Sequence, residues 1–160
     1  MKLRWIPFVP PMIDVPCRES HDMAATEVPP HPVPDEDSGA FWAATAAGRL
    51  ELCRCRACRR WLQPPLERCP QCFGGTAFEP VSGTGVVYSF IVVHQPAIPG
   101  YRDQLPYTVA LVELDEQAGL RLPGRIVGAG ANEVAVGRRV AAEIEDLPGG
   151  DFKVAVFRPV

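Results

Sequence analysis

Hydrophobic and polar positions alternate along the second half of the chain in the way expected of β-strands. Between residues 138 and 145, Val140, Ala142 and Ile144 fall on one face while Glu143 and Glu145 fall on the other. Four further stretches are rich in β-branched residues and are separated by glycine and proline turns. In chain order, the five predicted strands cover residues 85–94, 107–115, 120–128, 138–145 and 152–158.

Five antiparallel strands of this length fit a small closed or nearly closed barrel. Among such barrels the five-stranded OB-fold is the commonest, and a fragment of a β-sandwich is the main alternative. Glycines at positions 83, 85, 124 and 128 permit the bends that a small barrel needs. We therefore expect a mainly β protein with an OB-fold over residues 80–160.

The first part of the chain lacks this alternation. Residues 1–34 contain eight of the 18 prolines and no sustained period, which predicts an extended, flexible tail. Met23 within it is an alternative natural start, so residues 1–22 need not belong to the natural protein. Residues 35–48 follow with acidic and capping residues, then Phe41 and Trp42, and then Gly48, the pattern of a short helix.

Overall composition agrees with a globular chain. Hydrophobic residues make up 47% and charged residues 22%. The longest largely apolar stretch, residues 86–93, is far shorter than the ~20 residues that cross a bilayer. Early prolines interrupt the N-terminal apolar residues, so there is no clean signal-peptide core. We expect a soluble, cytoplasmic protein without membrane contact.

Four cysteines form two Cys-Xaa-Xaa-Cys pairs, Cys55 with Cys58 and Cys69 with Cys72, with ten residues between the pairs. This spacing is typical of two knuckles that place four thiolates around one zinc ion, and it is poor geometry for disulfides. Sulfur fills all four positions, so no site remains for an activated water and the metal is structural. We predict a rubredoxin-like zinc ribbon over residues 49–79.

Other assignments of the cysteines remain open at this stage. Iron binds a similar set of four thiolates, and unrelated core cysteines are a further alternative. Cys53 competes with Cys55 as a ligand, although Cys55 gives the better spacing. Cys17 lies in the predicted tail and is expected to be a free thiol.

Charge is unevenly distributed, although the net charge is only −3. Residues 49–79 carry six basic and three acidic residues, whereas residues 80–160 carry seven basic and nine acidic ones. Four thiolates around zinc leave a charge near −2, which the neighbouring arginines balance. This balance argues against a basic nucleic-acid surface. The arginines are Arg54, Arg56, Arg59, Arg60 and Arg68.

Several further motifs stand beside the two cysteine pairs in a fixed order along the chain. They are Phe41-Trp42, Gly48-Arg-Leu50, Pro64-Pro65, Gly83-Thr-Gly-Val-Val-Tyr-Ser89 and Tyr107-Thr-Val-Ala-Leu-Val-Glu-Leu-Asp115. Together these motifs resemble one known family, the zinc-ribbon OB-fold proteins associated with acyl-CoA metabolism, long catalogued as a domain of unknown function. The order of the motifs is more specific than any one of them, and the resemblance covers residue 36 to the end. Two departures are the long tail and Glu116-Gln-Ala-Gly119 in place of a tighter acidic-glycine turn.

The resemblance implies a non-catalytic accessory subunit that forms a hetero-oligomer with a thiolase-like enzyme. That enzyme would be a thiolase, a hydroxymethylglutaryl-CoA synthase or a thiolase-related aldolase, as in lipid or steroid side-chain metabolism. In such complexes the helix and ribbon dock on the enzyme, which predicts Phe41 and Trp42 as interface residues. The alternative is that both rings pack on this protein's own ribbon or barrel. The OB domain would help to form the acyl-CoA site.

Residues that connect the first two strands are the candidate CoA contacts, because OB-folds often bind ligands there. Tyr101 and Arg102 are predicted to meet the adenine ring or a phosphate, and a solvated loop is the alternative. The sequence leaves two other functions as alternatives. One is single-stranded nucleic-acid binding by ribbon and barrel. The other is independent catalysis by Ser89, His94 and Asp103, which no recognisable catalytic motif accompanies.

Overall fold

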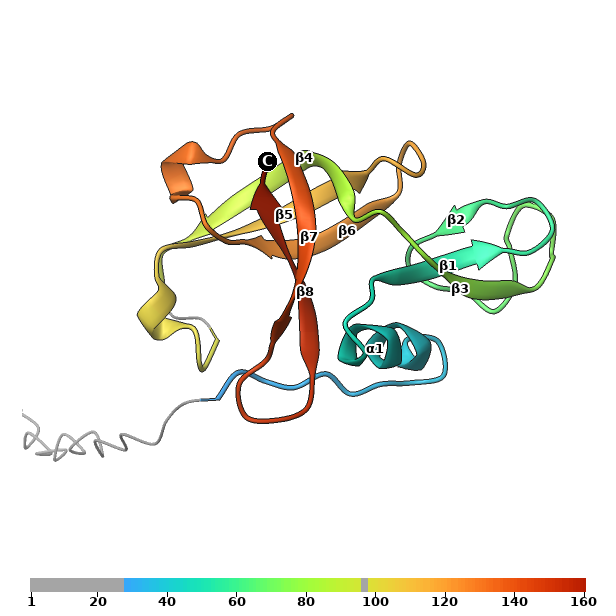
Figure 1. Ribbon diagram of the computed structural model, residues 1–160, viewed down its shortest axis with the longest axis horizontal. Coiled ribbons are helices and arrows are strands. Elements are labelled where there is room, and N and C mark those ends of the chain that lie inside the picture. Colours follow the sequence, from blue (N-terminus) through green and yellow to red (C-terminus); the bar gives the residue numbers. More distant parts are fainter. Residues whose placement is uncertain (1–27, 96–97) are drawn as a thin grey trace, which may run out of the picture.

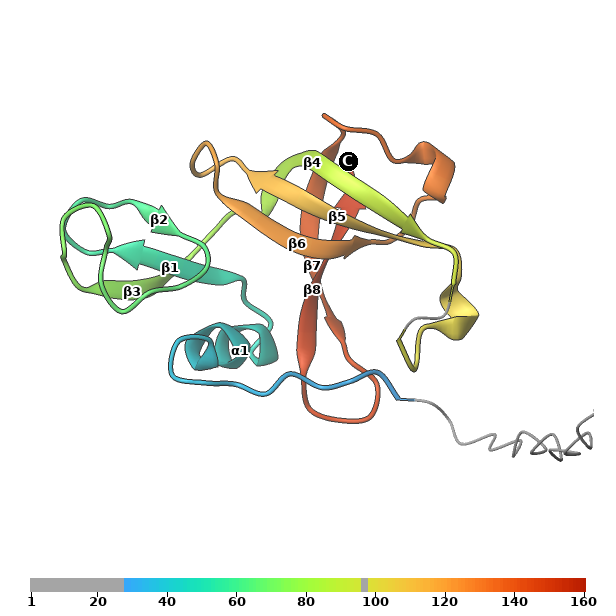
Figure 2. The same cartoon turned by 180° about the vertical axis from the view of Figure 1, so that it is seen from behind.

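The computed structural model describes residues 28–95 and 98–160, and this part of the chain is mainly β. A short helix, α1 (Gly39–Ala46), precedes a three-stranded ribbon and a five-stranded barrel (Figures 1 and 2). Residues 1–27, including Cys17 and Met23, lie outside the described residues. Among residues 28–95 and 98–160, no helix is both long enough and apolar enough to span a membrane.

Polar contacts and a glycine fix the two ends of α1. The Oδ1 of Asp35 accepts hydrogen bonds from the backbone N–H of Ser38 at 2.8 Å and from its hydroxyl at 2.6 Å. At the other end, Gly48 adopts a φ of +76°, a conformation that residues with a Cβ disfavour. The prediction of a short helix is therefore confirmed, and the helix ends at Ala46, two residues before Gly48.

The ribbon consists of β1 (Glu51–Cys55), β2 (Trp61–Leu62) and β3 (Thr76–Pro80), with β1 in the middle of the sheet. All its pairings are antiparallel, and Arg54 on β1 lies opposite Trp61 on one side and Ala77 on the other. The end of the ribbon that carries the two knuckles points away from the barrel (Figure 1).

The barrel contains five strands in the order β4-β5-β6-β8-β7, and it closes through pairing of β7 with β4. Every predicted barrel strand is present, with ends within two residues of those expected. The strands are β4 (Thr84–Val93), β5 (Tyr107–Leu114), β6 (Arg121–Ile126), β7 (Arg139–Asp146) and β8 (Lys153–Pro159).

One detail of the predicted barrel is wrong, because β6 and β8 pair in parallel. The reason is geometric: neighbours in a closed ring with an odd number of strands cannot all run antiparallel. The other barrel pairings are antiparallel.

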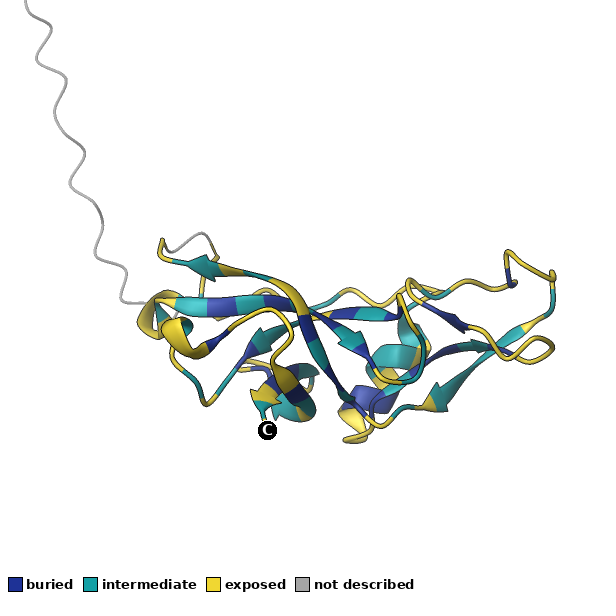
Figure 3. Ribbon diagram, turned by 90° about the horizontal axis from the view of Figure 1, so that it is seen from above, coloured by how far each residue is buried: buried dark blue, intermediate teal, exposed yellow. Residues whose placement is uncertain are grey.

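All five strands contribute side chains to the core cluster of the barrel. Buried positions alternate with partly buried ones along β5, as the burial colours of Figure 3 show. Phe157 is the largest side chain that is fully buried. Its ring occupies the space beside Gly124, where a Cβ would lie 2.7 Å from two ring carbons. The same core cluster includes Leu50, Leu52 and Trp61 of the ribbon segment, so the ribbon covers part of the barrel core.

Residues 28–34 form neither helix nor strand and lie beside the loop that joins β7 to β8 (Figure 1). The Nε2 of His31 is 3.0 Å from the carbonyl oxygen of Pro148 in that loop. The imidazole ring also contacts the ring of Phe152, at 5.8 Å between centroids. Through these contacts, the segment before α1 packs along the hairpin formed by β7 and β8.

Candidate metal centre and docking pocket

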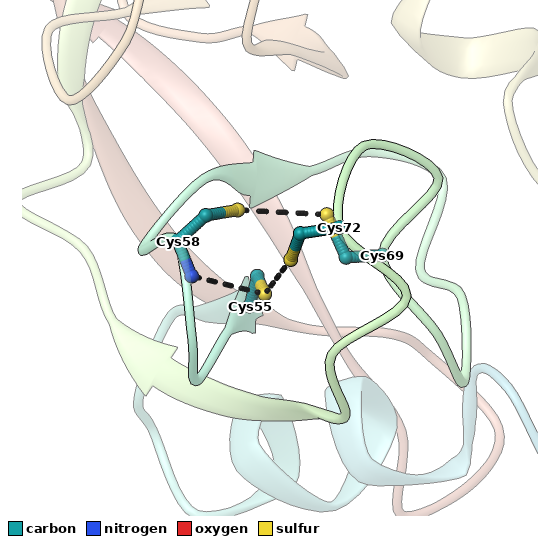
Figure 4. Close-up of side chains that lie close together, drawn as sticks. All are labelled: Cys55, Cys58, Cys69 and Cys72. Carbon is teal, nitrogen blue, oxygen red and sulfur yellow. Dashed lines mark hydrogen bonds between the residues drawn. The ribbon is translucent and has the colours of Figure 1, made fainter.

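Cys55, Cys58, Cys69 and Cys72 gather at the end of the ribbon, where the two knuckles face each other (Figure 4). Their four Sγ atoms all lie within 4.8 Å of one another. The Sγ atoms of Cys55 and Cys72 are 3.5 Å apart, and those of Cys58 and Cys69 are 3.6 Å apart. Zinc–sulfur bonds of about 2.3 Å in a tetrahedron place sulfurs about 3.8 Å apart, so the arrangement fits a metal ion. A disulfide needs about 2.05 Å and does not fit.

Backbone amides stabilise negative charge on these sulfurs. The N–H of Cys58 donates to the Sγ of Cys55 at 3.4 Å, and this contact is the largest of the effects that lower the pKa of Cys55 to about 6. The N–H of Gln71 likewise lowers the pKa of Cys69. Burial of both sulfurs opposes these shifts. In each knuckle a backbone N–H therefore favours the thiolate form of the first cysteine.

Cys53 lies outside this cluster although it is also buried. Its thiol contacts the carbonyl oxygen of Leu66 at 3.6 Å. Cys53 and Cys55 point to the same face of β1, but only Cys55 begins a knuckle.

The residue that follows each knuckle has a left-handed backbone conformation. Arg59 has a φ of +64° and Phe73 a φ of +58°, where a side chain with a Cβ costs about 1 kcal/mol or more. Gly74 comes next, and a Cβ there would lie 2.9 Å from the Cβ of Ala57 and 3.2 Å from the Sγ of Cys55. The second knuckle therefore requires glycine at position 74 and tolerates phenylalanine at position 73.

The arginines around the centre fall into two groups. Arg54 and Arg59 both pair with Glu79, whose pKa is lowered chiefly by its hydrogen bonds from Arg59. Arg59 makes this contact through two nitrogens, at 2.6 and 2.7 Å. The second group forms no ion pair within residues 28–95 and 98–160, and all its members are exposed. This group is Arg56, Arg60 and Arg68.

A pocket of about 340 Å³ lies where α1, the ribbon and the barrel meet. Phe41 and Trp42 of α1 form part of its wall. The ribbon contributes Pro65 and Phe78, and the barrel contributes β6 and β8. Its lining is largely apolar, so it suits a hydrophobic group.

Phe41 and Trp42 are both half-buried within the protein itself. Phe41 packs against the barrel core, and the ring of Trp42 meets it edge-on at 5.0 Å between centroids. Trp42 also contacts Phe152 edge-on, at 6.2 Å. The two rings thus have partners in this chain and still border the pocket. Their role in an interface stays a prediction.

Tyr101 and Arg102 lie in the connection between β4 and β5, beside the short helical turn η1 (Arg102–Gln104). The ring of Tyr101 is half-buried against Tyr107, at 5.5 Å between centroids, and the guanidinium of Arg125 lies 5.7 Å from it. Arg102 is exposed. Since the ring of Tyr101 already contacts Tyr107 and Arg125 within the protein, this geometry does not support the predicted CoA contact.

A contact between ribbon and barrel was not foreseen from sequence. Gln117, in the turn between β5 and β6, accepts a hydrogen bond from the backbone N–H of Trp61 at 2.9 Å. Its side-chain amide also donates to the carbonyl of Trp61 at 3.2 Å. The neighbouring Glu116 accepts a hydrogen bond from the N–H of Ser82. The departure Glu116-Gln-Ala-Gly119 thus contacts the ribbon at Trp61 and the connection between β3 and β4 at Ser82.

Comparison with known proteins places both parts of the chain in one class. Residues 42–79 match the family model described as the ChsH2 rubredoxin-like zinc ribbon domain, and residues 78–145 match that of the ChsH2 C-terminal OB-fold domain. The chain is therefore a zinc-ribbon OB-fold protein. It belongs to the DUF35 family, which confirms the resemblance found in the sequence.

Relatives with curated descriptions carry two kinds of name. A probable enoyl-CoA hydratase alpha subunit of Thermomonospora curvata is 38% identical over 133 residues, which cover 81% of this chain and 40% of that protein. A DUF35 domain-containing scaffold protein of Methanocaldococcus jannaschii is 40% identical over 91 residues, which cover 56% of this chain and 62% of that protein. The chain thus spans only part of both relatives.

One solved structure is similar to most of this chain. It is a chain of the Ltp2-ChsH2(DUF35) aldolase, with a TM-score of 0.73 and 35% sequence identity. The match covers 81% of this chain and 98% of that chain. This chain is therefore homologous to a subunit that is described within an aldolase assembly.

Proposed function

We propose that this protein is a non-catalytic accessory subunit of a thiolase-like enzyme that processes acyl-CoA thioesters. The observation that carries the proposal is the match to nearly the full length of one chain of the Ltp2-ChsH2(DUF35) aldolase. A relative named as a scaffold protein supports the non-catalytic part. The enzyme subunit would supply the reacting residues, and this chain would shape and position its acyl-CoA site.

The pocket beside α1 is the surface that we assign to the enzyme. Its largely apolar wall accepts a hydrophobic side chain, and Trp42 offers a large ring at its edge. A ring that already packs on Phe41 and Phe152 loses little conformational freedom on binding. We assign Phe41 mainly to support of Trp42, because Phe41 packs on the barrel core.

The metal in this proposal is a zinc ion held by the four knuckle cysteines. Four thiolates leave no exchangeable position, so its contribution is to the fold of the ribbon. Metal binding in such modules supplies on the order of 10–16 kcal/mol, enough to decide whether a ribbon of this size is folded. Zinc would thereby fix the ribbon wall of the pocket.

The test is capture of the tagged protein from its native host, followed by mass spectrometry. We expect a thiolase-like protein in near-stoichiometric amount, and Trp42→Ala should reduce its retention at least about tenfold, as for a central aromatic contact. Val136→Ala changes an exposed apolar residue that does not line the pocket, and it should retain the enzyme fully.

Two results would contradict the proposal. One is retention of nucleic acid with no thiolase-like protein, which would favour the nucleic-acid function. The other is turnover of an acyl-CoA by the purified chain alone, which would make it an enzyme in its own right.

A further inference from the structure

Phe73 is an aromatic residue that the fold itself does not use. Its side chain is 74% exposed, more than that of any other described aromatic residue, and it follows the second knuckle directly. The knuckles form the end of the ribbon that points away from the barrel (Figures 1 and 2). We call residues 56–60 and 68–75 the ribbon tip.

The backbone makes this exposure unusual. Phe73 has a φ of +58°, a conformation that glycine adopts freely and a phenylalanine does not. Arg59 occupies the same position after the first knuckle, but its side chain binds Glu79 within the ribbon. Phe73 gains no comparable contact, so neither folding nor packing accounts for the ring. Strained residues of this kind concentrate where a protein binds something.

Charge around the ring indicates what it binds. The guanidinium of Arg68 contacts the carbonyl oxygen of Phe73 at 3.4 Å, and that of Arg60 contacts Gln71 at the same distance. The backbone N–H of Arg56 donates to Gly75. These three arginines lack carboxylate partners among the described residues, so they can pair with carboxylates of another molecule.

We propose that the ribbon tip is a second docking point, at which Phe73 enters an apolar pocket on the enzyme subunit and the three arginines meet acidic residues around that pocket. The inference rests on the accessory function proposed above. The tip lies at the end of the ribbon that points away from the barrel (Figure 1), whereas the α1 pocket lies where the ribbon meets α1 and the barrel, so the enzyme is held at two separated points. A nucleic acid fits less well, since the tip has one exposed ring and lies over four thiolates.

The test uses the zinc-loaded full chain and the enzyme subunit identified by native capture, both purified. Phe73→Gly removes the ring and relieves the left-handed backbone. We expect an unchanged or higher unfolding temperature together with affinity at least about tenfold lower. Phe73→Leu keeps an apolar side chain and should lose less affinity.

A charge variant tests the rim of the tip. Combined Arg56→Gln, Arg60→Gln and Arg68→Gln should slow association and weaken its dependence on salt. The control is Arg138→Gln, since Arg138 is an exposed arginine on the barrel and, like the other three, has no ion pair among the described residues. It should associate as the wild type does.

The outcomes separate the two proposals. If the wild type binds the enzyme and Phe73→Gly binds within about twofold of it, the tip is not a docking point and the accessory function stands. A lower unfolding temperature for Phe73→Gly would also overturn the inference, because the ring would then serve the fold. If the wild type does not bind the enzyme, both proposals fail. Loss of binding to a labelled oligothymidylate in Phe73→Gly would identify a nucleic-acid contact instead.

Discussion

Two adjacent glycines beside the metal centre differ in the space that their surroundings leave for a side chain. Gly74 lies so close to the sulfurs that any Cβ would press on Ala57 and Cys55. Gly75, one residue later, has no atom within 4 Å of the place where its Cβ would stand. Two adjacent glycines thus have different roles, and only the first is set by the metal centre.

Gly74→Ala should weaken zinc binding, because the added methyl group pushes the second knuckle away from Cys55. We expect a loss of about 1–3 kcal/mol in the stability of the ribbon, as for other overpacked sites. Competition with a chromophoric zinc chelator measures the change. Gly75→Ala is the matched control and should bind zinc as the wild type does, and equal zinc affinity in both variants would contradict the packing argument.

Asp115 gives the barrel a pH-dependent contribution to stability. Its carboxylate accepts hydrogen bonds from two nitrogens of Arg139, each at 2.7 Å, and one from the hydroxyl of Thr84, also at 2.7 Å. The bonds from Arg139, followed by that from Thr84, lower the pKa of Asp115 to about 2, from 3.8. A depressed carboxyl pKa stabilises the fold above the unfolded-state value and loses that effect as pH falls through the folded-state value.

Asp115→Asn should therefore lower stability at neutral pH, and the difference from the wild type should shrink as the pH falls from about 4 to about 2 and disappear below that. Chemical denaturation at a series of pH values measures it. Acid releases zinc from both proteins, so the difference between their free energies of unfolding reports on the carboxylate of Asp115 and not on the metal. Arg139→Gln in the Asp115→Asn background should cause little further loss of stability. A difference between wild type and Asp115→Asn that is as large at pH 2 as at neutral pH would refute the assignment.

At the scale of elements, the sequence predicts some features well and others hardly at all. Alternation along residues 138–145 and turn residues between stretches identify all five barrel strands, because each strand has one buried face. The short ribbon strands have no such signal. β2 is only two residues long, too short to show an alternation of hydrophobic and polar positions. Its pairing with β1 and the metal centre stabilise it instead.

The candidate site divides in the same way. Spacing along the chain suffices to group the four cysteines, because each knuckle is local. The pocket beside α1 could not be foreseen, since Trp42, Pro65 and Val154 come from three distant segments. Phe73 also gave no signal, because a left-handed φ at a phenylalanine is visible only in the backbone. Glu116-Gln-Ala-Gly119 stood out in sequence, but its contact with Trp61 did not.

The turn between β5 and β6 should control how firmly the ribbon is held. Gln117→Ala removes both hydrogen bonds to the backbone of Trp61, at a cost of about 1 kcal/mol each. We expect faster amide exchange at Trp61 while the zinc content stays constant. Ala118→Ser alters the neighbouring exposed residue and should leave amide exchange at Trp61 unchanged. If exchange at Trp61 in Gln117→Ala is as slow as in the wild type, strand pairing alone holds β2 in place.

At the scale of the whole molecule, the barrel and the near end of the ribbon share one hydrophobic core. Leu52 and Trp61 of the ribbon belong to the cluster that contains Val112 and Phe157 of the barrel. The cluster around the knuckles, which includes Cys55 and Leu62, is separate and small. Zinc therefore holds the far end of the ribbon, and the near end is part of the barrel core.

Removal of zinc should consequently destabilise the barrel as well as the ribbon. The knuckles unfold without metal, and β1 and β2 then cover the barrel core less firmly. Calorimetry of the zinc-loaded chain should show one transition, and the chelated chain should show a barrel transition at lower temperature. Cys58→Ser should reproduce the chelated state, whereas Cys53→Ser, which changes no sulfur of the metal cluster, should keep its zinc. A barrel transition at the same temperature with and without zinc would mean that the two parts fold independently, and the apolar contact of Trp61 with the barrel would then contribute little to stability.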